Sequence, residues 1–91
     1  AIEAMTRSLA VELSQKSIRV NAITAGAVET PMHQRLLRGM PEKAAQDYLA
    51  RHPLGFGQPI DISNLAAFLL SDVSCWMTGS CIVLDGGYAS V

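Results

Sequence analysis

The order of apolar and polar positions predicts helices that alternate with two short strands. Residues 1 to about 15 predict an amphipathic helix, because apolar side chains recur there at spacings of three and four. These apolar positions are Ile2, Met5, Leu9 and Leu13. Opposite charges four residues apart stabilise the other side of such a helix, and the pairs here are Glu3 with Arg7 and Glu12 with Lys16. No capping side chain precedes this helix, so we expect further residues upstream in the complete protein.

Two segments predict short buried strands. Residues 18–24 contain four β-branched side chains and end at Ala25 and Gly26. Residues 80–84 form a nearly continuous apolar run that Asp85-Gly86-Gly87 closes. Two apolar strands separated by helices predict a parallel sheet that helices cover. A single crossover leaves strand edges unpaired, which again indicates that part of the fold is missing.

Three helices are predicted between these strands. Thr30 places a capping hydroxyl before Pro31, so a short helix is expected from there toward Gly39. Pro41 is expected to begin a second helix in the same way, over residues 42–51. After the breaker-rich loop 52–59, a third helix is expected to run to about Ser71. Its predicted buried stripe is Ile62, Leu65, Ala66 and Leu69.

Composition and charge exclude several classes of function. The 91 residues are 49% hydrophobic and 16% charged, with a formal net charge of −1, which indicates a folded chain rather than a disordered one. No cluster of Lys and Arg is present, so neither nucleic acid nor a membrane surface is an expected partner. No apolar run approaches the ~20 residues that span a bilayer, and no export signal is visible, so we expect a cytoplasmic location. Cys75 and Cys81 form no metal-binding spacing; we expect both thiols to be reduced and buried, and no metal site.

A few polar residues call for structural explanations. Arg19 lies within a predicted strand, so its charge needs carboxylate or carbonyl partners, which we expect outside this chain. Asn21 is expected to tie neighbouring backbone, and Asp85 to stabilise its glycine-rich turn. His33 and His52 have no nucleophile or carboxylate at a recognisable spacing, so we expect exposed or structural roles for both. The segment Gly55-Phe56-Gly57 is expected to be a turn rather than a nucleotide fingerprint.

Five short motifs, taken in order, resemble the C-terminal part of the classical short-chain dehydrogenase/reductase family. They are residues 18–23, 26–32, 59–62, 78–79 and 84–88. The resemblance implies an α/β fold in which this chain is the C-terminal portion of a Rossmann-type doubly wound parallel sheet, in the order helix, strand, helices, strand. It further implies that residues 1–91 are the C-terminal segment of a single NAD(P)-binding domain whose N-terminal part is absent.

The resemblance also assigns roles to the loop that follows the first strand. In open α/β sheets ligands bind beyond the carboxyl ends of the strands. By resemblance Gly26, the main chain of Val28 and the hydroxyl of Thr30 hold the nicotinamide end of NAD or NADP, while Met32 and Leu36 face a small alcohol or carbonyl substrate. From the residues alone, Gly26 is equally a turn residue, Thr30 a helix cap, and the Met32–Leu36 stripe ordinary packing.

Two residues depart from the family pattern. Relatives usually carry proline where this chain has Ala25, which leaves the loop one more free dihedral angle. Phe56 stands where a basic residue is common, which alters an ion pair or an interface rather than the chemistry.

The family's catalytic tyrosine, and the lysine four positions after it, have no counterpart here, since Tyr48 is followed at that spacing by His52. By resemblance the pair lies upstream. We therefore expect a fragment of an NAD(P)-dependent oxidoreductase that interconverts an alcohol and a carbonyl, inactive alone and part of a homotetramer or dimer. The alternatives are a noncatalytic interaction or oligomerisation module and a degenerate relative without catalytic residues.

Overall fold

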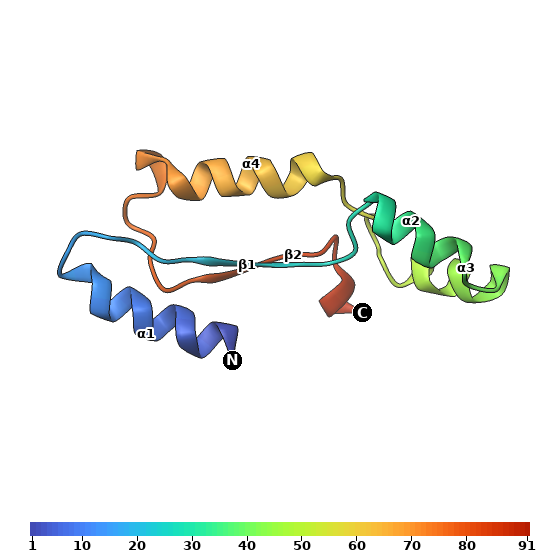
Figure 1. The fold of residues 1–91 in the computed structure, drawn as a ribbon, viewed down its shortest axis with the longest axis horizontal. Coiled ribbons are helices and arrows are strands. Elements are labelled where there is room, and N and C mark those ends of the chain that lie inside the picture. Colours follow the sequence, from blue (N-terminus) through green and yellow to red (C-terminus); the bar gives the residue numbers. More distant parts are fainter. The chain divides into compact units, whose positions relative to one another are not determined.

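The computed structural model describes residues 1–91, and its elements follow the predicted order of helix, strand, helices and strand (Figure 1). These elements are α1 (Ile2–Ser14), β1 (Ala22–Ala25), α2 (Pro31–Arg38), α3 (Glu42–Ala50), α4 (Pro59–Leu70), the 3₁₀ turn η1 (Asp72–Ser74), β2 (Cys81–Leu84) and the 3₁₀ turn η2 (Tyr88–Ser90). The α/β class is confirmed. None of the helices combines the length and the hydropathy that a membrane span requires.

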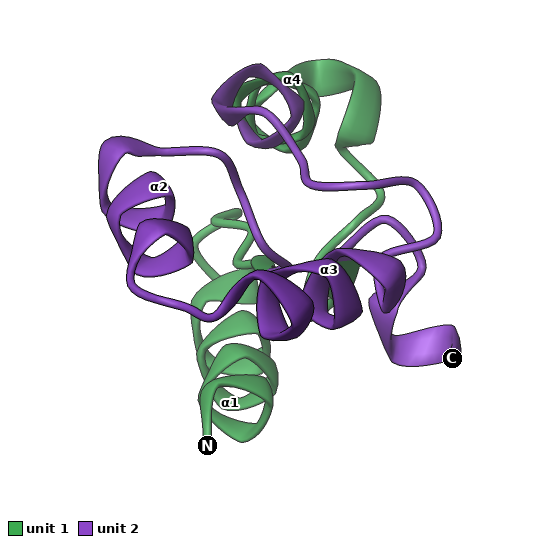
Figure 2. Ribbon diagram, turned by 90° about the vertical axis from the view of Figure 1, so that its right-hand side faces the viewer, with its two compact units in different colours: residues 1–24, 63–83 green, residues 25–62, 84–91 purple.

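Contacts divide the chain into two compact units. Unit 1 consists of residues 1–24 and 63–83, and unit 2 of residues 25–62 and 84–91 (Figure 2). The strands β1 and β2 pair as a two-stranded sheet. The Ala22 N–H donates to the Ser80 carbonyl at 2.9 Å, and the Gly26 N–H donates to the Leu84 carbonyl at 3.0 Å. Residue numbers rise together along both strands, so the pairing is parallel, as the apolar pattern predicted.

The first strand begins later than predicted, at Ala22 instead of residue 18. The cause is the main chain of Val20, whose N–H donates to the Thr78 hydroxyl at 3.0 Å and whose carbonyl accepts from the Gly79 N–H at 2.7 Å. These contacts occupy the main-chain groups of Val20 that would otherwise extend the hydrogen bonding between β1 and β2. The prediction that both strands are buried is also wrong, because Thr24, Ala25 and Val83 are exposed.

Helix α1 packs mainly through small side chains, and of its predicted apolar stripe only Leu13 is half-buried. Thr6 and Ala10 are its buried residues, at 4% and 3% exposed, whereas Ile2 and Met5 are 62% and 56% exposed. A Cβ atom placed on Gly79 would lie 3.4 Å from the Ala10 Cβ, so the loop before β2 approaches this face of the helix closely. A larger side chain at Ala10 would not fit that approach.

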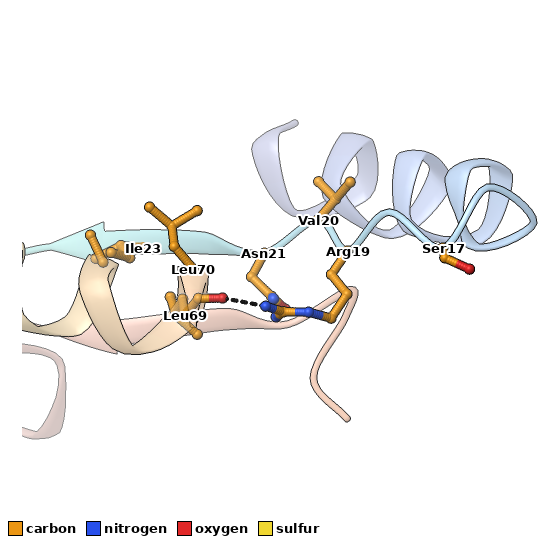
Figure 3. Close-up of a pocket in the computed structure, with 8 residues that line it drawn as sticks. Ser17, Arg19, Val20, Asn21, Ile23, Leu69 and Leu70 are labelled. Atoms are coloured by element: carbon orange, nitrogen blue, oxygen red, sulfur yellow. Dashed lines mark hydrogen bonds between the residues drawn. The ribbon is translucent and has the colours of Figure 1, made fainter. Parts of the chain in front are cut away.

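Arg19 finds its partners inside the chain, contrary to prediction. Its guanidinium donates to the Leu69 carbonyl at 2.8 Å (Figure 3). It also donates to the carbonyls of Ser71 at 3.1 Å and Met77 at 3.2 Å. Leu69 lies in the last turn of α4 and Ser71 directly follows the helix, a region whose carbonyls lack helical partners. The charge is therefore stabilised by carbonyl dipoles, two of them at the C-terminal end of a helix, where a cation is favourable.

Two further polar side chains hold the same region of unit 1. As predicted, Asn21 ties backbone: its amide donates to the Met77 carbonyl at 3.1 Å and its oxygen accepts from the Ser80 N–H at 3.1 Å. The buried Ser74 hydroxyl lies 2.8 Å from the Phe68 carbonyl and 2.9 Å from that of Leu69.

The two cysteines are free thiols, and the prediction that both are buried is wrong for Cys75 and met only in part by Cys81. Cys75 is exposed and Cys81 is half-buried. Cys75 directly follows η1, beside Trp76, which is 97% exposed. Cys75 lies outside any helix or strand, so no regular element directs its side chain toward the core, where a free thiol usually lies.

Candidate functional site

The candidate site is the loop that joins the end of β1 to α2. Gly26 opens this loop where the two strand ends meet, and a Cβ atom there would lie 2.8 Å from both Cα and Cβ of Asp85. Only glycine permits this approach without a shift of the backbone. Packing within this chain therefore requires glycine at position 26, independently of the cofactor role that the resemblance assigns to it.

Val28 lies in a short parallel bridge with Gly57. The Gly57 N–H donates to the Ala27 carbonyl at 2.9 Å, and the Glu29 N–H donates to the Gly57 carbonyl at 2.8 Å. In a parallel bridge of this kind, the N–H and carbonyl of the central residue, here Val28, point away from the partner strand. The main-chain groups of Val28 are thus fixed in position yet make no hydrogen bond within the chain.

Thr30 is the N-cap of α2, as predicted. Its hydroxyl oxygen accepts from the His33 N–H at 3.1 Å, and Pro31 occupies the first turn. A hydroxyl has one proton to donate as well as lone pairs to accept with. Capping uses only an acceptor position, so the hydroxyl proton stays available to a ligand. The two roles suggested by the sequence are therefore compatible.

Helix α2 leaves the predicted substrate-side residues uncovered. Met32 and Leu36, one turn apart, are 73% and 56% exposed. The opposite side of the helix does the packing, with His33 buried and Leu37 half-buried. Within this chain α2 therefore packs through its inner side, and Met32 and Leu36 make up its uncovered side.

Aromatic and imidazole rings pack against one another in unit 2. The His33 ring meets the edge of Phe56 at a centroid distance of 4.6 Å, and the His52 ring stacks on Tyr88 at 4.7 Å. His52 Nδ1 also lies 2.8 Å from the Tyr48 carbonyl. Both histidines are buried, and neither bonds to a carboxylate, which fits the predicted structural role. Phe56 fills the space between them: its ring centroid is 5.1 Å from that of His52.

Sequence reasoning missed a side-chain contact that reaches the same loop. The Gln58 amide donates to the Glu29 carboxylate at 2.7 Å, between residues 29 positions apart. Gln58 is itself held by Asp61: its N–H donates to the Asp61 carboxylate at 2.8 Å, and its carbonyl accepts from the Asp61 N–H at 2.9 Å. Pro59 with Asp61 in the following turn was a visible helix-start signal, whereas nothing local marked Gln58 or Glu29.

An open groove of about 580 Å³ lies elsewhere, in unit 1 (Figure 3). Its lining includes Arg19, Asn21, Ile23 and Leu70. None of the five predicted site residues lines it. The groove and the candidate loop are therefore separate features of the chain.

Comparison with known proteins places this geometry in context. Residues 1–89 match the protein family described as Enoyl-(Acyl carrier protein) reductase. The 3-oxoacyl-[acyl-carrier-protein] reductase FabG of Thermotoga maritima is 46% identical over 84 residues, which cover 91% of this chain and 32% of that protein. Oxidoreductase UcpA of Escherichia coli K12 is 42% identical over 92 residues, which cover 96% of this chain and 35% of that protein.

A solved structure shows the same arrangement. The crystal structure of a short chain dehydrogenase family protein from Francisella tularensis matches with a TM-score of 0.87 and 39% identity, over 99% of this chain and 40% of that one. The chain thus spans about a third of the length of the curated relatives that it matches.

Proposed function

Because the chain belongs to the short-chain dehydrogenase/reductase family, we propose that residues 1–91 are the C-terminal segment of a cytoplasmic NAD(P)-dependent oxidoreductase. In this proposal a single Rossmann-type domain interconverts an alcohol and a carbonyl. The observation that carries it is the loop 26–30, which fixes the main-chain groups of Val28 without partners in the chain and fixes the Thr30 hydroxyl oxygen, whose proton is free to donate. The relatives named as reductases and oxidoreductases support the same chemistry.

These free groups fit one end of a nicotinamide cofactor. A carboxamide offers both a donor and an acceptor, and so can pair with an N–H, a carbonyl and a hydroxyl. In the proposal Val28 supplies the first two through its main chain, and Thr30 supplies the third. NAD or NADP, when bound, supplies or accepts the hydride. The role of this chain is to orient the ring, since a reaction of this kind requires the reacting atoms to be held in a near-attack arrangement.

Met32 and Leu36 supply the substrate side of the proposed site. Two apolar side chains one turn apart on the exposed side of α2 offer a surface for the apolar part of a small substrate. Contact between the substrate and these two side chains would also exclude water from the reacting atoms. The tyrosine and lysine that complete the chemistry belong, by resemblance, to the upstream part of the protein, so the 91 residues alone are proposed to be inactive.

The proposal includes assembly as a homotetramer or dimer. Its support is the apolar surface of the chain, where Ile2 and Met5 on α1 and Trp76 after η1 are exposed by 56% or more. Such surface is typical of contacts with other protein segments. The same observation favours the alternative function, a noncatalytic interaction module, which would bind no cofactor.

Substitution of Thr30 in the complete protein tests the proposal. Thr30→Asp keeps an acceptor for the His33 N–H, and so keeps the cap, but at neutral pH it has no proton to donate. We expect Thr30→Asp to raise the dissociation constant for NAD(P)H about tenfold, the equivalent of one lost hydrogen bond, while the melting temperature stays close to that of the original protein. Thr30→Ser, which retains the hydroxyl, is the matched control.

The outcomes separate the two functions. If Thr30→Asp binds NAD(P)H as tightly as the original protein, then Thr30 serves only as the helix cap. A complete protein that binds neither NADH nor NADPH would contradict the oxidoreductase and favour the interaction module.

A further inference from the structure

We propose that Gln58 is a positioning residue for the cofactor loop, which it holds through its hydrogen bond to Glu29. This inference rests on the proposed function, because it concerns how Val28 and Thr30 are kept in place. Gln58 itself faces Glu29 and Asp61, and no role as a ligand of cofactor or substrate is assigned to it.

The geometry places Glu29 at the centre of the loop. It lies between Val28 and Thr30, the two residues with free groups for a ligand. Its N–H is already bonded to the Gly57 carbonyl at 2.8 Å, and its carboxylate is bonded to the Gln58 amide at 2.7 Å. Main chain and side chain of one loop residue are thus attached to two consecutive residues of another segment.

That segment is anchored in turn to the first turn of α4. The Gln58 N–H and carbonyl are both bonded to Asp61, at 2.8 and 2.9 Å. An acidic side chain that reaches back to the N–H ahead of a helix is half of a capping box, a rigid local arrangement. A continuous set of hydrogen bonds therefore runs from Asp61 through Gln58 to Glu29.

Side-chain restraint matters here because the main-chain bridge is short. Only two hydrogen bonds join residues 27–29 to Gly57. The Glu29–Gln58 contact adds a third, and a hydrogen bond to a carboxylate is stronger than one between neutral groups. Loss of this contact would let residues 28–30 sample other orientations, so cofactor would bind a loop that is correctly arranged for only part of the time.

A charge-exchange series in the complete protein tests the inference. Gln58→Glu places two carboxylates opposite each other at this exposed contact, and we expect it to raise the dissociation constant for NAD(P)H up to about fivefold, since like charges in contact are unfavourable even where solvent screens them. The double variant Glu29→Gln/Gln58→Glu restores a carboxylate–amide pair with its polarity reversed. We expect its dissociation constant to return to within about twofold of the original. The KM for cofactor should follow the same order, with kcat changed less.

Rescue by the double variant separates positioning from a merely structural role. If Gln58→Glu binds cofactor as tightly as the original protein, or if the double variant is as weak as Gln58→Glu, the inference is overturned. Should Gln58→Glu fail to fold, Gln58→Met removes the amide without adding charge, and the same weakening is expected of it.

The Thr30 variants distinguish this failure from failure of the proposed function. Weakened binding in Thr30→Asp together with normal binding in Gln58→Glu rejects the positioning role alone. A complete protein that binds no nicotinamide cofactor rejects both.

Discussion

Replacement of Gly26 by alanine tests whether the close approach of the two strand ends in unit 2 requires glycine at this position. The added Cβ would lie 2.8 Å from Asp85 Cα, 2.8 Å from Asp85 Cβ and 3.2 Å from the Asp85 carbonyl oxygen. Two of these three atoms belong to the main chain, so no change of side-chain rotamer removes the clash. The strand ends would have to separate, against the hydrogen bond of 3.0 Å from the Gly26 N–H to the Leu84 carbonyl.

The expected magnitude is the difference between two terms. Overpacking of one methyl group against fixed atoms destabilises a protein by about 1–3 kcal/mol. Alanine also reduces the freedom of the unfolded chain, which stabilises the folded state by about 0.4–1 kcal/mol where the backbone conformation is permitted. Gly26 does not have a positive φ, so no further backbone strain is added. The net expectation is a loss of about 1–2 kcal/mol.

Two other glycines serve as matched controls. Gly39 has a φ of −80° and no atom closer than 3.6 Å to its Cβ position, so Gly39→Ala should stabilise the protein by about 0.4–1 kcal/mol. Gly55 has a φ of +76° and open space around it, so Gly55→Ala should show the cost of the left-handed backbone alone, about 1–2 kcal/mol.

Chemical denaturation of the complete protein, followed by circular dichroism, measures all three variants. A Gly26→Ala variant with the same midpoint as the original, or a higher one, would refute the reasoning. Unchanged stability of Gly26→Ala together with weakened cofactor binding would show that glycine is needed at this position for the cofactor and not for packing.

Other substitutions test the polar contacts of unit 1. Arg19→Lys should lower the free energy of unfolding by about 2 kcal/mol, because one ammonium cannot reach three carbonyls that the guanidinium binds at 2.8–3.2 Å. Arg7→Lys is its control: Arg7 has only an exposed ion pair with Glu3, so a change within about 0.5 kcal/mol is expected, and an equal loss in both variants would contradict the anchoring role of Arg19. Ser74→Ala should lower the melting temperature through a loss of about 0.5–1.5 kcal/mol, since it removes the one hydrogen bond that the buried hydroxyl can donate to carbonyls at the end of α4, whereas alanine at the exposed Ser90 should leave the melting temperature unchanged.

Local signals made the helices predictable. Thr30 followed by Pro31 marks the start of α2, and Pro59 with Asp61 marks that of α4. Each signal acts within one turn of the chain, so the sequence contains all of it. Pro41 shows the limit of this precision, since it precedes α3 as the N-cap instead of occupying the first helical position.

Contacts between distant residues were not predictable in the same way. The start of β1 depends on Thr78, and the partners of Arg19 lie 50 to 58 positions away. The buried side of α1 depends on how closely Gly79 approaches Ala10, which hydrophobic spacing does not reveal. The fold class and the loop that forms the candidate site followed from the sequence, whereas the contacts that hold that loop followed only from the structure.

The anchoring of Arg19 has a consequence for how this region tolerates sequence drift. All three of its acceptors are main-chain carbonyls, which every amino acid possesses. The side chains at residues 69, 71 and 77 can therefore change without removing an acceptor, while position 19 has no such freedom. The contacts of Arg19 depend on the path of the main chain and not on the neighbouring side chains, so this one side chain can keep the geometry through many substitutions around it.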